Sequence, residues 1–374
     1  MAGIYVHIPF CESKCIYCDF YSIAGRNGQL GHYVDCVLRE AEMRKAELEE
    51  TFMTLYVGGG TPSLLSSRQF SELVHGLRQT FNLTSLQEFT VEVNPDDVTL
   101  EWLEAIGDLG VNRLSMGIQS FHDDELKRIN RRHTAQQAIE AVEAIGQAGI
   151  PNVSIDLIYG LPDQSLDAWR DNVIRAISLG VQHISAYNMM YEKGTRLWVM
   201  RQSGKVREVD EETSLSMYQV LVDLLKRSGY LHYEISNFAL PGFQSKHNSS
   251  YWNLTPYLGL GAAAHSFDGA VRRYNPASLS DYMNSVSEGV LPFEQEEESE
   301  EECFDEYVML RLRTAQGLSL TEVERRFGDK ASTHVVEESL KHIAAGRLLR
   351  RGDVLKLTHS GVMLSDMVTR DLMW

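Results

Sequence analysis

The chain has 374 residues, which suits two domains or one barrel-sized domain with an appendage. Its formal net charge of −17 argues against a nucleic-acid partner, because phosphate binding needs a basic surface. The sequence contains neither an apolar run of the roughly 18 residues that a membrane span needs nor the features of a signal peptide. Its five cysteines include a cluster of three, which favours a metal site over a disulfide framework. We therefore expect a cytoplasmic protein with a metal site.

Residues 1–230 are predicted to form a barrel, because short β-rich runs alternate there with amphipathic stretches. Strands are predicted at residues 3–8, 54–59, 89–94, 112–119, 152–160 and 182–188, and helices at residues 32–50, 68–81, 135–149 and 167–180. Six such alternations indicate a parallel sheet, here an α/β fold with a partial (β/α)6 barrel of the TIM type. Polar residues end several of these strands, where barrels carry out chemistry: Glu92, Asn94, Gln119, Asp156 and Asn188.

The alternation ends near residue 230. Residues 231–295 are rich in glycine, asparagine and aromatic residues, and we expect loops packed over a site. The acidic run at 293–306 is predicted to be a solvated linker and helix start. Residues 296–374 are predicted to form a small α+β module like a winged helix, with a Ser319–Glu322 capping box and a hairpin turning at Gly352–Asp353. The acidic balance favours a packing or lid role over DNA binding.

Three cysteines, Cys11, Cys15 and Cys18, lie within eight residues in a CxxxCxxC pattern. A structural zinc site needs a fourth ligand, and His7 approaches awkwardly from four residues upstream on a predicted strand. Three free cysteines without a role are rare at this spacing. In an iron–sulfur cubane, three thiolates bind three irons and leave the fourth iron open to an external ligand. The pattern therefore favours an iron–sulfur cluster, while Cys36 and Cys303 are expected to be ordinary helix cysteines.

The motif and its surroundings resemble a known family. Together with CxxxCxxC, the stretches YVHIPFC, GGGTP, VEVNPDD, MGIQSF, NRRH and IDLIYGLP resemble the radical S-adenosylmethionine (SAM) superfamily, in the branch of the oxygen-independent coproporphyrinogen oxidases and the HemW-type haem chaperones. The resemblance covers residues 3–290, and the terminal module resembles the C-terminal domain of that branch. It implies a [4Fe–4S] cluster on the three cysteines, whose fourth iron is chelated by SAM, and an electron transfer that cleaves SAM to an adenosyl radical.

The resemblance also implies a SAM site. Its members are Tyr5, Tyr17, Gly59, Gly60, Thr61, Glu92, Gln119, Arg131, Asp156 and Met190. The glycines let backbone approach a ligand closely, although the same run also suits a simple tight turn. Glu92 suits the ribose hydroxyls and Arg131 suits a carboxylate. His7 is placed near the cluster as a candidate catalytic residue. Taken singly, each polar residue is more commonly a rim residue in a salt bridge.

Two features favour the chaperones within this branch. The oxidases have a further cysteine two residues after the motif, where this chain has Phe20, and an N-terminal extension before the first strand, which begins here at Gly3. The chaperones carry HNxxY, present here at residues 247–251. The resemblance implies that His247 ligates haem iron, with Tyr251 in the haem site. Ligation needs a neutral imidazole, so we expect haem affinity to fall below about pH 6.

The sequence thus predicts a haem chaperone that holds a [4Fe–4S] cluster and SAM and passes haem to an acceptor protein. The expected partners are haem, the acceptor, an electron donor and, peripherally, membrane respiratory proteins. One alternative is an oxidase that decarboxylates coproporphyrinogen III to protoporphyrinogen IX. Another is a chain whose cluster and SAM only stabilise a docking surface.

Overall fold

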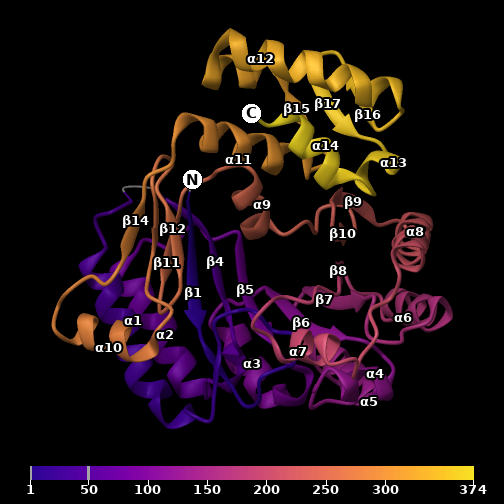
Figure 1. Ribbon diagram of the computed structural model, residues 1–374. Helices are drawn as coiled ribbons and strands as arrows, with labels where there is room; N and C mark the ends of the chain where they lie inside the picture. The colour runs from indigo at the N-terminus through magenta and orange to yellow at the C-terminus, as the bar shows by residue number, and fades with distance from the viewer. Residues whose placement is uncertain (1, 49–50) are drawn as a thin grey trace.

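Six parallel strands form the centre of the protein, whose computed structural model describes residues 2–48 and 51–374. The six strands are hydrogen-bonded in chain order and lie in an arc (Figure 1): β1 (Ala2–Ile8), β4 (Phe52–Gly59), β5 (Glu88–Val93), β6 (Arg113–Gln119), β7 (Asn152–Tyr159) and β8 (His183–Asn188). They match the six predicted strands, so the prediction of a partial barrel is confirmed.

Helices cover one face of this arc and leave the other open (Figure 1). They are α1 (Leu30–Met43), α2 (Ser67–Thr80), α3 (Leu100–Asp108), α5 (Ala135–Gln147), α6 (Leu166–Ser178) and α8 (Glu211–Arg227), with the shorter α4 (Asp123–Arg128) and α7 (Arg196–Gln202). The four predicted helices are confirmed, although α1 ends at Met43 and residues 49–50 of that prediction lie outside the described residues. Each buries an apolar stripe in the core: α2, for example, buries Phe70, Leu73 and Leu77.

Residues 231–295 contain regular structure, so the prediction of loops is wrong there. They form β9 (Leu231–Glu234), β10 (Asn237–Ala239), α9 (Lys246–Trp252), β11 (Tyr257–Leu260), β12 (His265–Phe267), β13 (Arg272–Tyr274), α10 (Leu279–Ser287) and β14 (Glu294–Glu296). β11 pairs in parallel with β1, and antiparallel strands continue both edges of the sheet to twelve strands. Strands of three or four residues are too short to show an alternating pattern, which explains the error.

A buried ion pair at the C-terminal end of α1 anchors residues 231–295, which we call the extension. Glu40 is fully buried and accepts hydrogen bonds from the Gly261 N–H (2.8 Å) and the Tyr282 hydroxyl (2.7 Å). Arg44 lies 2.9 Å from Glu40 and donates to the Gly259 carbonyl at 2.8 Å. Because these buried charges are paired and hydrogen-bonded to the extension, they hold β11 and α10 firmly against the barrel.

The C-terminal module has its own apolar core and lies at one end of the barrel (Figure 1). It contains α11 (Glu300–Leu312), β15 (Leu318–Ser319), α12 (Leu320–Ala344), β16 (Leu348–Arg351), β17 (Val354–Leu357), α13 (His359–Val362) and α14 (Ser365–Leu372). The predicted hairpin at Gly352–Asp353 and the helix start in the acidic run are confirmed. Ser319 caps α12 as expected, but Glu322 pairs with Arg325 rather than closing a capping box.

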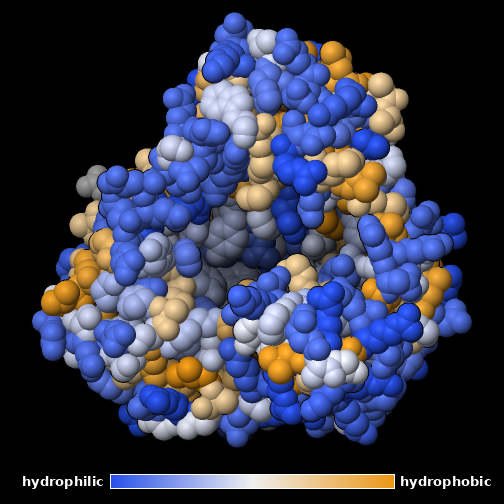
Figure 2. Space-filling model, in the orientation of Figure 1, coloured by the Kyte–Doolittle hydropathy of each residue, from blue (hydrophilic) through white to orange (hydrophobic). Residues whose placement is uncertain are grey.

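The barrel and the module together enclose the functional region. Figure 2 shows the molecule hollowed at its centre, between the barrel and the C-terminal module. No helix in the described part of the chain combines the length and the apolar character that a bilayer crossing requires. The carboxyl ends of the parallel strands, which carry most of the predicted site residues, line a cavity.

Candidate cofactor site

The three clustered cysteines lie in a loop that follows β1. β2 (Phe10–Cys11) pairs with β3 (Ile23–Ala24), which closes the loop at its base. All three thiols are free and only partly buried. The Thr61 hydroxyl donates to the Cys11 sulfur at 3.5 Å, and the Arg131 guanidinium donates to the Cys15 sulfur at 3.5 Å. Polar hydrogens thus point at sulfurs, which suits thiolates in an iron–sulfur site.

The surroundings of the cysteines do not match a zinc site. Among the described residues, no three histidine, cysteine or acidic side chains converge on one metal ion. His7, considered as a fourth ligand, has its Nδ1 2.9 Å from the Tyr5 hydroxyl and its Nε2 3.0 Å from the Tyr21 carbonyl. Three thiolates that each bind a different iron of a cubane need no such convergence, so the arrangement is compatible with a cluster.

A cavity of about 480 Å³ opens beside the three cysteines, and we call it the cluster cavity. Besides Cys11, Cys15 and Cys18, nine of the ten predicted SAM residues line it: Tyr17, Gly59, Gly60, Thr61, Glu92, Gln119, Arg131, Asp156 and Met190. The tenth, Tyr5, lines a neighbouring cavity together with His7. The carboxyl ends of the parallel strands bring most of these residues together, as we expected for a partial barrel.

The glycines of GGGTP stand where a side chain does not fit. A Cβ on Gly60 would lie 2.7 Å from the Phe10 carbonyl oxygen and 3.0 Å from the Cys11 sulfur. Gly59 has φ +116°, and a Cβ there would lie 2.8 Å from the His7 ring. The run therefore does more than form a turn, because it lets backbone pack directly on the cysteine loop.

Glu92 and Asp156 are acids at the inner wall of the cluster cavity. The Tyr56 hydroxyl (2.7 Å) and the Gly59 N–H (2.9 Å) donate to the two carboxylate oxygens of Glu92. Burial raises the pKa of Glu92 to about 7 and also raises the pKa of Asp156. Both carboxyl groups suit hydrogen-bonding to hydroxyls and amines of a ligand.

Arg131 supplies a cation to the same cavity. It donates to the Asn94 side-chain oxygen at 2.9 Å and to the Gly117 carbonyl, while its buried Nε has no hydrogen-bond partner among the described residues. Gln119, next to it, has φ +68°, which is unusual for a residue other than glycine. Backbone strain of this kind is concentrated at functional sites.

Sequence reasoning missed several residues of this region. Ser115, Ser185 and Tyr187 also line the cluster cavity, beside Asn94 and Asn188, which the sequence already placed at strand ends. Arg113, at the start of β6, is 1% exposed, and its Nε and Nη1 have no partner in the described chain. Its charge opposes the rise in the pKa of Glu92 and of Asp156. The sequence signal for Arg113 was a charged residue at the first position of a strand whose other residues are uncharged.

His247 lies in helix α9 rather than in a loop. α9 sits at the amino ends of the strands: the His247 N–H donates to Glu88 at the start of β5 (2.9 Å), and Thr54 near the start of β4 lies 2.8 Å from Nδ1. Nε2 lies 2.8 Å from the Tyr251 hydroxyl, and the side chain is 1% exposed. Ligation of haem iron by His247 therefore requires the ring to lose a hydrogen bond and become exposed.

The pH expectation for His247 is wrong in this environment. Burial lowers the pKa of His247 to about 3, because the charged imidazolium loses its hydration. The ring is therefore already neutral at pH 6, and its protonation cannot cause a loss of affinity there.

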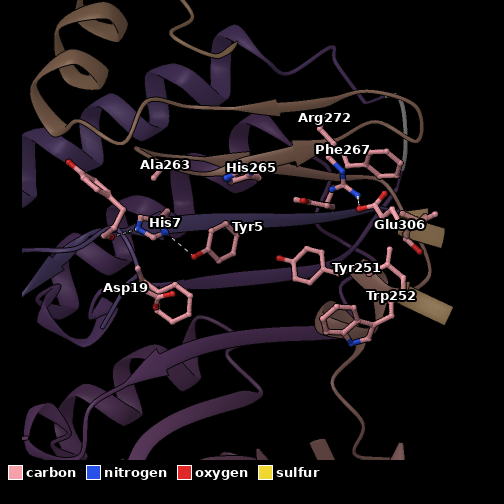
Figure 3. A pocket seen from close by; sticks show the side chains of 16 residues that line it. Tyr5, His7, Asp19, Tyr251, Trp252, Ala263, His265, Phe267, Arg272 and Glu306 are labelled. Atoms are coloured by element: carbon pink, nitrogen blue, oxygen red, sulfur yellow. Dashed lines mark hydrogen bonds and ion pairs between the residues drawn. The ribbon is translucent and has the colours of Figure 1, made fainter. Parts of the chain in front are cut away.

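A second cavity, of about 630 Å³, lies beside the first, and we call it the aromatic cavity. Its walls come from β1, from α9, from the antiparallel strands β12 and β13 and from α11 of the C-terminal module. In Figure 3 the Tyr251 ring points toward Tyr5, whose hydroxyl is turned toward His7, and His265 and Arg272 stand on the strands β12 and β13 of the same sheet. Asp19 and Phe20 line both cavities, so the two adjoin at the cysteine loop.

Comparison with known proteins identifies the family. The model of the radical SAM superfamily matches residues 5–176, and that of the HemN C-terminal domain matches residues 299–364. Heme chaperone HemW of Lactococcus lactis is 36% identical over 86% of this chain and 84% of its own length, and that of Bacillus subtilis is 33% identical over 98% of each chain. The chain belongs to the HemW family of radical SAM proteins. Coproporphyrinogen III oxidase (HemN) of Escherichia coli shares the fold, with a TM-score of 0.86 over all of this chain and 90% of the oxidase at 23% identity.

Radical SAM proteins carry a [4Fe–4S] cluster and SAM, and the residues present fit both groups. Hydrogen-bond donors face two of the three sulfurs, and Gly60 keeps backbone close to Cys11. The unpartnered Nε of Arg131 suits a carboxylate, and the acids Glu92 and Asp156 suit hydroxyl or amino groups. The cluster cavity therefore offers a donor for the carboxylate of SAM and acceptors for its amino group and its hydroxyls.

Proposed function

We propose that the chain is a haem chaperone, which binds haem and passes it to an acceptor protein. The observation that carries this proposal is the 33–36% identity, over most of both chains, to proteins named heme chaperone HemW. The aromatic cavity supports it, because its volume falls within the roughly 300–1,000 Å³ of small-molecule sites. A protein with two adjoining cavities has room for a second large ligand beside SAM.

We assign the cluster cavity to the cluster and SAM. Cys11, Cys15 and Cys18 hold the cluster, Arg131 pairs with the carboxylate of SAM, and Glu92 accepts hydrogen bonds from its ribose. When bound, the cluster and SAM supply one-electron chemistry at the sulfonium centre of SAM. Gly60 and Thr61 keep the wall close to Cys11, which limits the access of water to that sulfur.

The alternative, decarboxylation of coproporphyrinogen, has weaker support. The similarity to coproporphyrinogen III oxidase, at 23% identity, concerns the fold alone. Phe20 stands where the resemblance places a further cysteine of the oxidases, and its side chain is 69% exposed at the junction of the two cavities. An exposed ring at this place suits contact with a flat ligand better than ligation of a metal.

The remaining partners are proposals of the same kind. An electron donor reduces the cluster, an acceptor protein takes the haem, and the protein makes peripheral contact with membrane respiratory proteins. The protein acts in the cytoplasm, where glutathione and thioredoxin keep cysteines reduced.

Haem transfer tests the function directly. The anaerobically reconstituted protein is loaded with haem and mixed with respiratory membranes depleted of haem. We expect haem to move to the membranes and the oxidase activity of the membranes to recover. A protein that binds no haem, or that converts coproporphyrinogen to protoporphyrinogen while consuming SAM, would overturn the proposal.

A further inference from the structure

The aromatic cavity has walls suited to a large flat molecule. Tyr251 and Tyr257 meet edge to face with ring centroids 4.8 Å apart, and Trp252 and Phe267 continue the lining. Tyr5 lines the same cavity from β1, the neighbour of β11 in the sheet, with its hydroxyl turned toward His7 (Figure 3). Aromatic side chains pack well on flat conjugated rings, both face to face and edge to face. The aromatic lining of this cavity thus favours a macrocycle over an extended polar ligand.

His265 is a histidine of this cavity whose ring is available. Neither of its ring nitrogens makes a hydrogen bond to another described residue, and its side chain is exposed. His7, the other histidine in the lining, has both nitrogens engaged by Tyr5 and Tyr21. The ring of His265 stacks on Tyr274 with centroids 5.6 Å apart, and these two residues are paired across β12 and β13. The imidazole is therefore both held in place and free to bind.

The cavity also contains polar groups that suit carboxylates. The Arg272 guanidinium is the cation of the lining. Arg272 lies over the Phe267 ring, 4.8 Å from its centroid, and pairs with Glu306 and, at 3.3 Å, with Glu298. Asp19 and Glu306 are the acids of the lining. A ligand carboxylate would compete with Glu306 for Arg272.

We propose that the aromatic cavity is the haem site, with His265 as an axial ligand of the iron and with Arg272 binding a propionate. This inference rests on the proposed haem-carrying function, since it names the place where that haem binds. Imidazole is a common axial ligand of haem iron. His247 then acts as a positioning residue, because its Nε2 holds the hydroxyl of Tyr251 in the wall.

This placement puts haem between three parts of the chain. The cavity adjoins the cysteine loop at Asp19 and Phe20, and α11 of the C-terminal module contributes Glu306 and Leu310 to it. Bound haem therefore contacts both the barrel and the module and lies next to the cluster loop. A rearrangement of the module against the barrel would open this site to an acceptor.

Titration with two ligands separates the iron bond from the packing of the macrocycle. Ferric haem and metal-free protoporphyrin IX are each titrated into the reconstituted protein and into its His265→Ala variant. We expect His265→Ala to weaken haem binding about tenfold or more and to shift the Soret band, with protoporphyrin affinity unchanged within about twofold. Unchanged protoporphyrin binding also shows that the variant is folded. His75→Ala, at an exposed position on α2, is the matched control and should change neither affinity.

Further variants complete the test. Imidazole added to His265→Gly should restore the haem spectrum, and Arg272→Gln should weaken both ligands because both carry propionates. His265→Ala with wild-type haem affinity and spectrum would overturn the proposal, the more so if His247→Ala alone abolished the Soret shift. A wild-type protein that bound no haem would instead overturn the proposed function itself.

Discussion

The cluster cavity and the aromatic cavity share Asp19 and Phe20, yet they are built in different ways. Parallel strands build the first, and their carboxyl ends bring polar side chains from distant parts of the sequence to one place. Short antiparallel strands, α9 and α11 build much of the second, which is rich in rings and contains one arginine. The comparison suggests that the barrel supplies cofactor chemistry, while the extension and the module supply a site for a cargo.

Removal of a cluster ligand should give the largest difference between the two cavities, because it should abolish iron binding and leave haem affinity unchanged. Cys15→Ser is expected to lower iron from about four per chain to near zero after anaerobic reconstitution, since each thiolate binds one iron. Haem affinity should stay within about twofold, because none of the described cysteines lines the aromatic cavity. Iron analysis and haem titration measure both effects, with Cys303→Ser as the control outside both cavities. Loss of haem together with iron would show that the cavities are not independent.

Glu40, the buried carboxylate of α1, should stabilise the walls of the aromatic cavity more than those of the cluster cavity, because its partners Gly261 and Tyr282 belong to residues 231–295. Glu40→Ala removes one of the two carboxylates that pair with the buried Arg44, the other being Glu47, and leaves the buried donors of Gly261 and Tyr282 without their acceptor, so we expect a loss of about 3–5 kcal/mol of unfolding free energy.

Urea denaturation measures this loss. Glu42→Ala, at an exposed ion pair on the same helix, should change the free energy by less than about 1 kcal/mol. Equal effects of the two variants would contradict the anchoring role of Glu40.

A methyl group on Gly60 should act on the cluster cavity alone. Gly60→Ala places a Cβ 2.7 Å from the Phe10 carbonyl, so we expect destabilisation of about 1–3 kcal/mol and lower iron content. Gly107→Ala, in α3 with no atom within 4 Å of the added Cβ, should instead stabilise by about 0.5–1 kcal/mol. Thermal denaturation and iron analysis of both variants provide the check, and normal iron content in Gly60→Ala would contradict the close packing.

The smallest expected effect concerns the pH dependence of the cluster cavity. The pKa of Glu92 is about 7 in the folded chain and near 4.5 in the unfolded one, so the folded state binds more protons between these values. Unfolding free energy should therefore fall as the pH rises from about 4.5 to above 7.

Thermal melts of the protein without SAM, at several pH values, test this sign. Glu92→Gln should remove this part of the pH dependence, whereas Glu72→Gln, on an exposed face of α2, should keep it. A slope that survives in Glu92→Gln would assign the titration to another group.

Much of the fold and of the cluster cavity was predictable from sequence, for a physical reason. The six parallel strands and the four helices are long enough to show a hydrophobic pattern in the sequence. Such a pattern can be recognised from neighbouring residues alone. The cluster motif is local as well, and residues such as Glu92 and Asp156 stand at strand ends that any βα barrel brings together. Only Tyr5, among the predicted SAM residues, lines the other cavity.

Tertiary structure alone decided the rest. Strands of three residues such as β12 carry too little pattern to predict, so neither their pairing nor the aromatic cavity between them and α11 could be foreseen. The burial of His247, with both nitrogens engaged by Thr54 and Tyr251, depends on contacts with residues almost 200 positions earlier in the chain. The sequence by itself determined a radical SAM barrel with three cluster cysteines, because motif and periodicity are local properties. Which histidine faces a cavity with free nitrogens was decided by packing, because burial and hydrogen-bond partners arise only when distant segments meet.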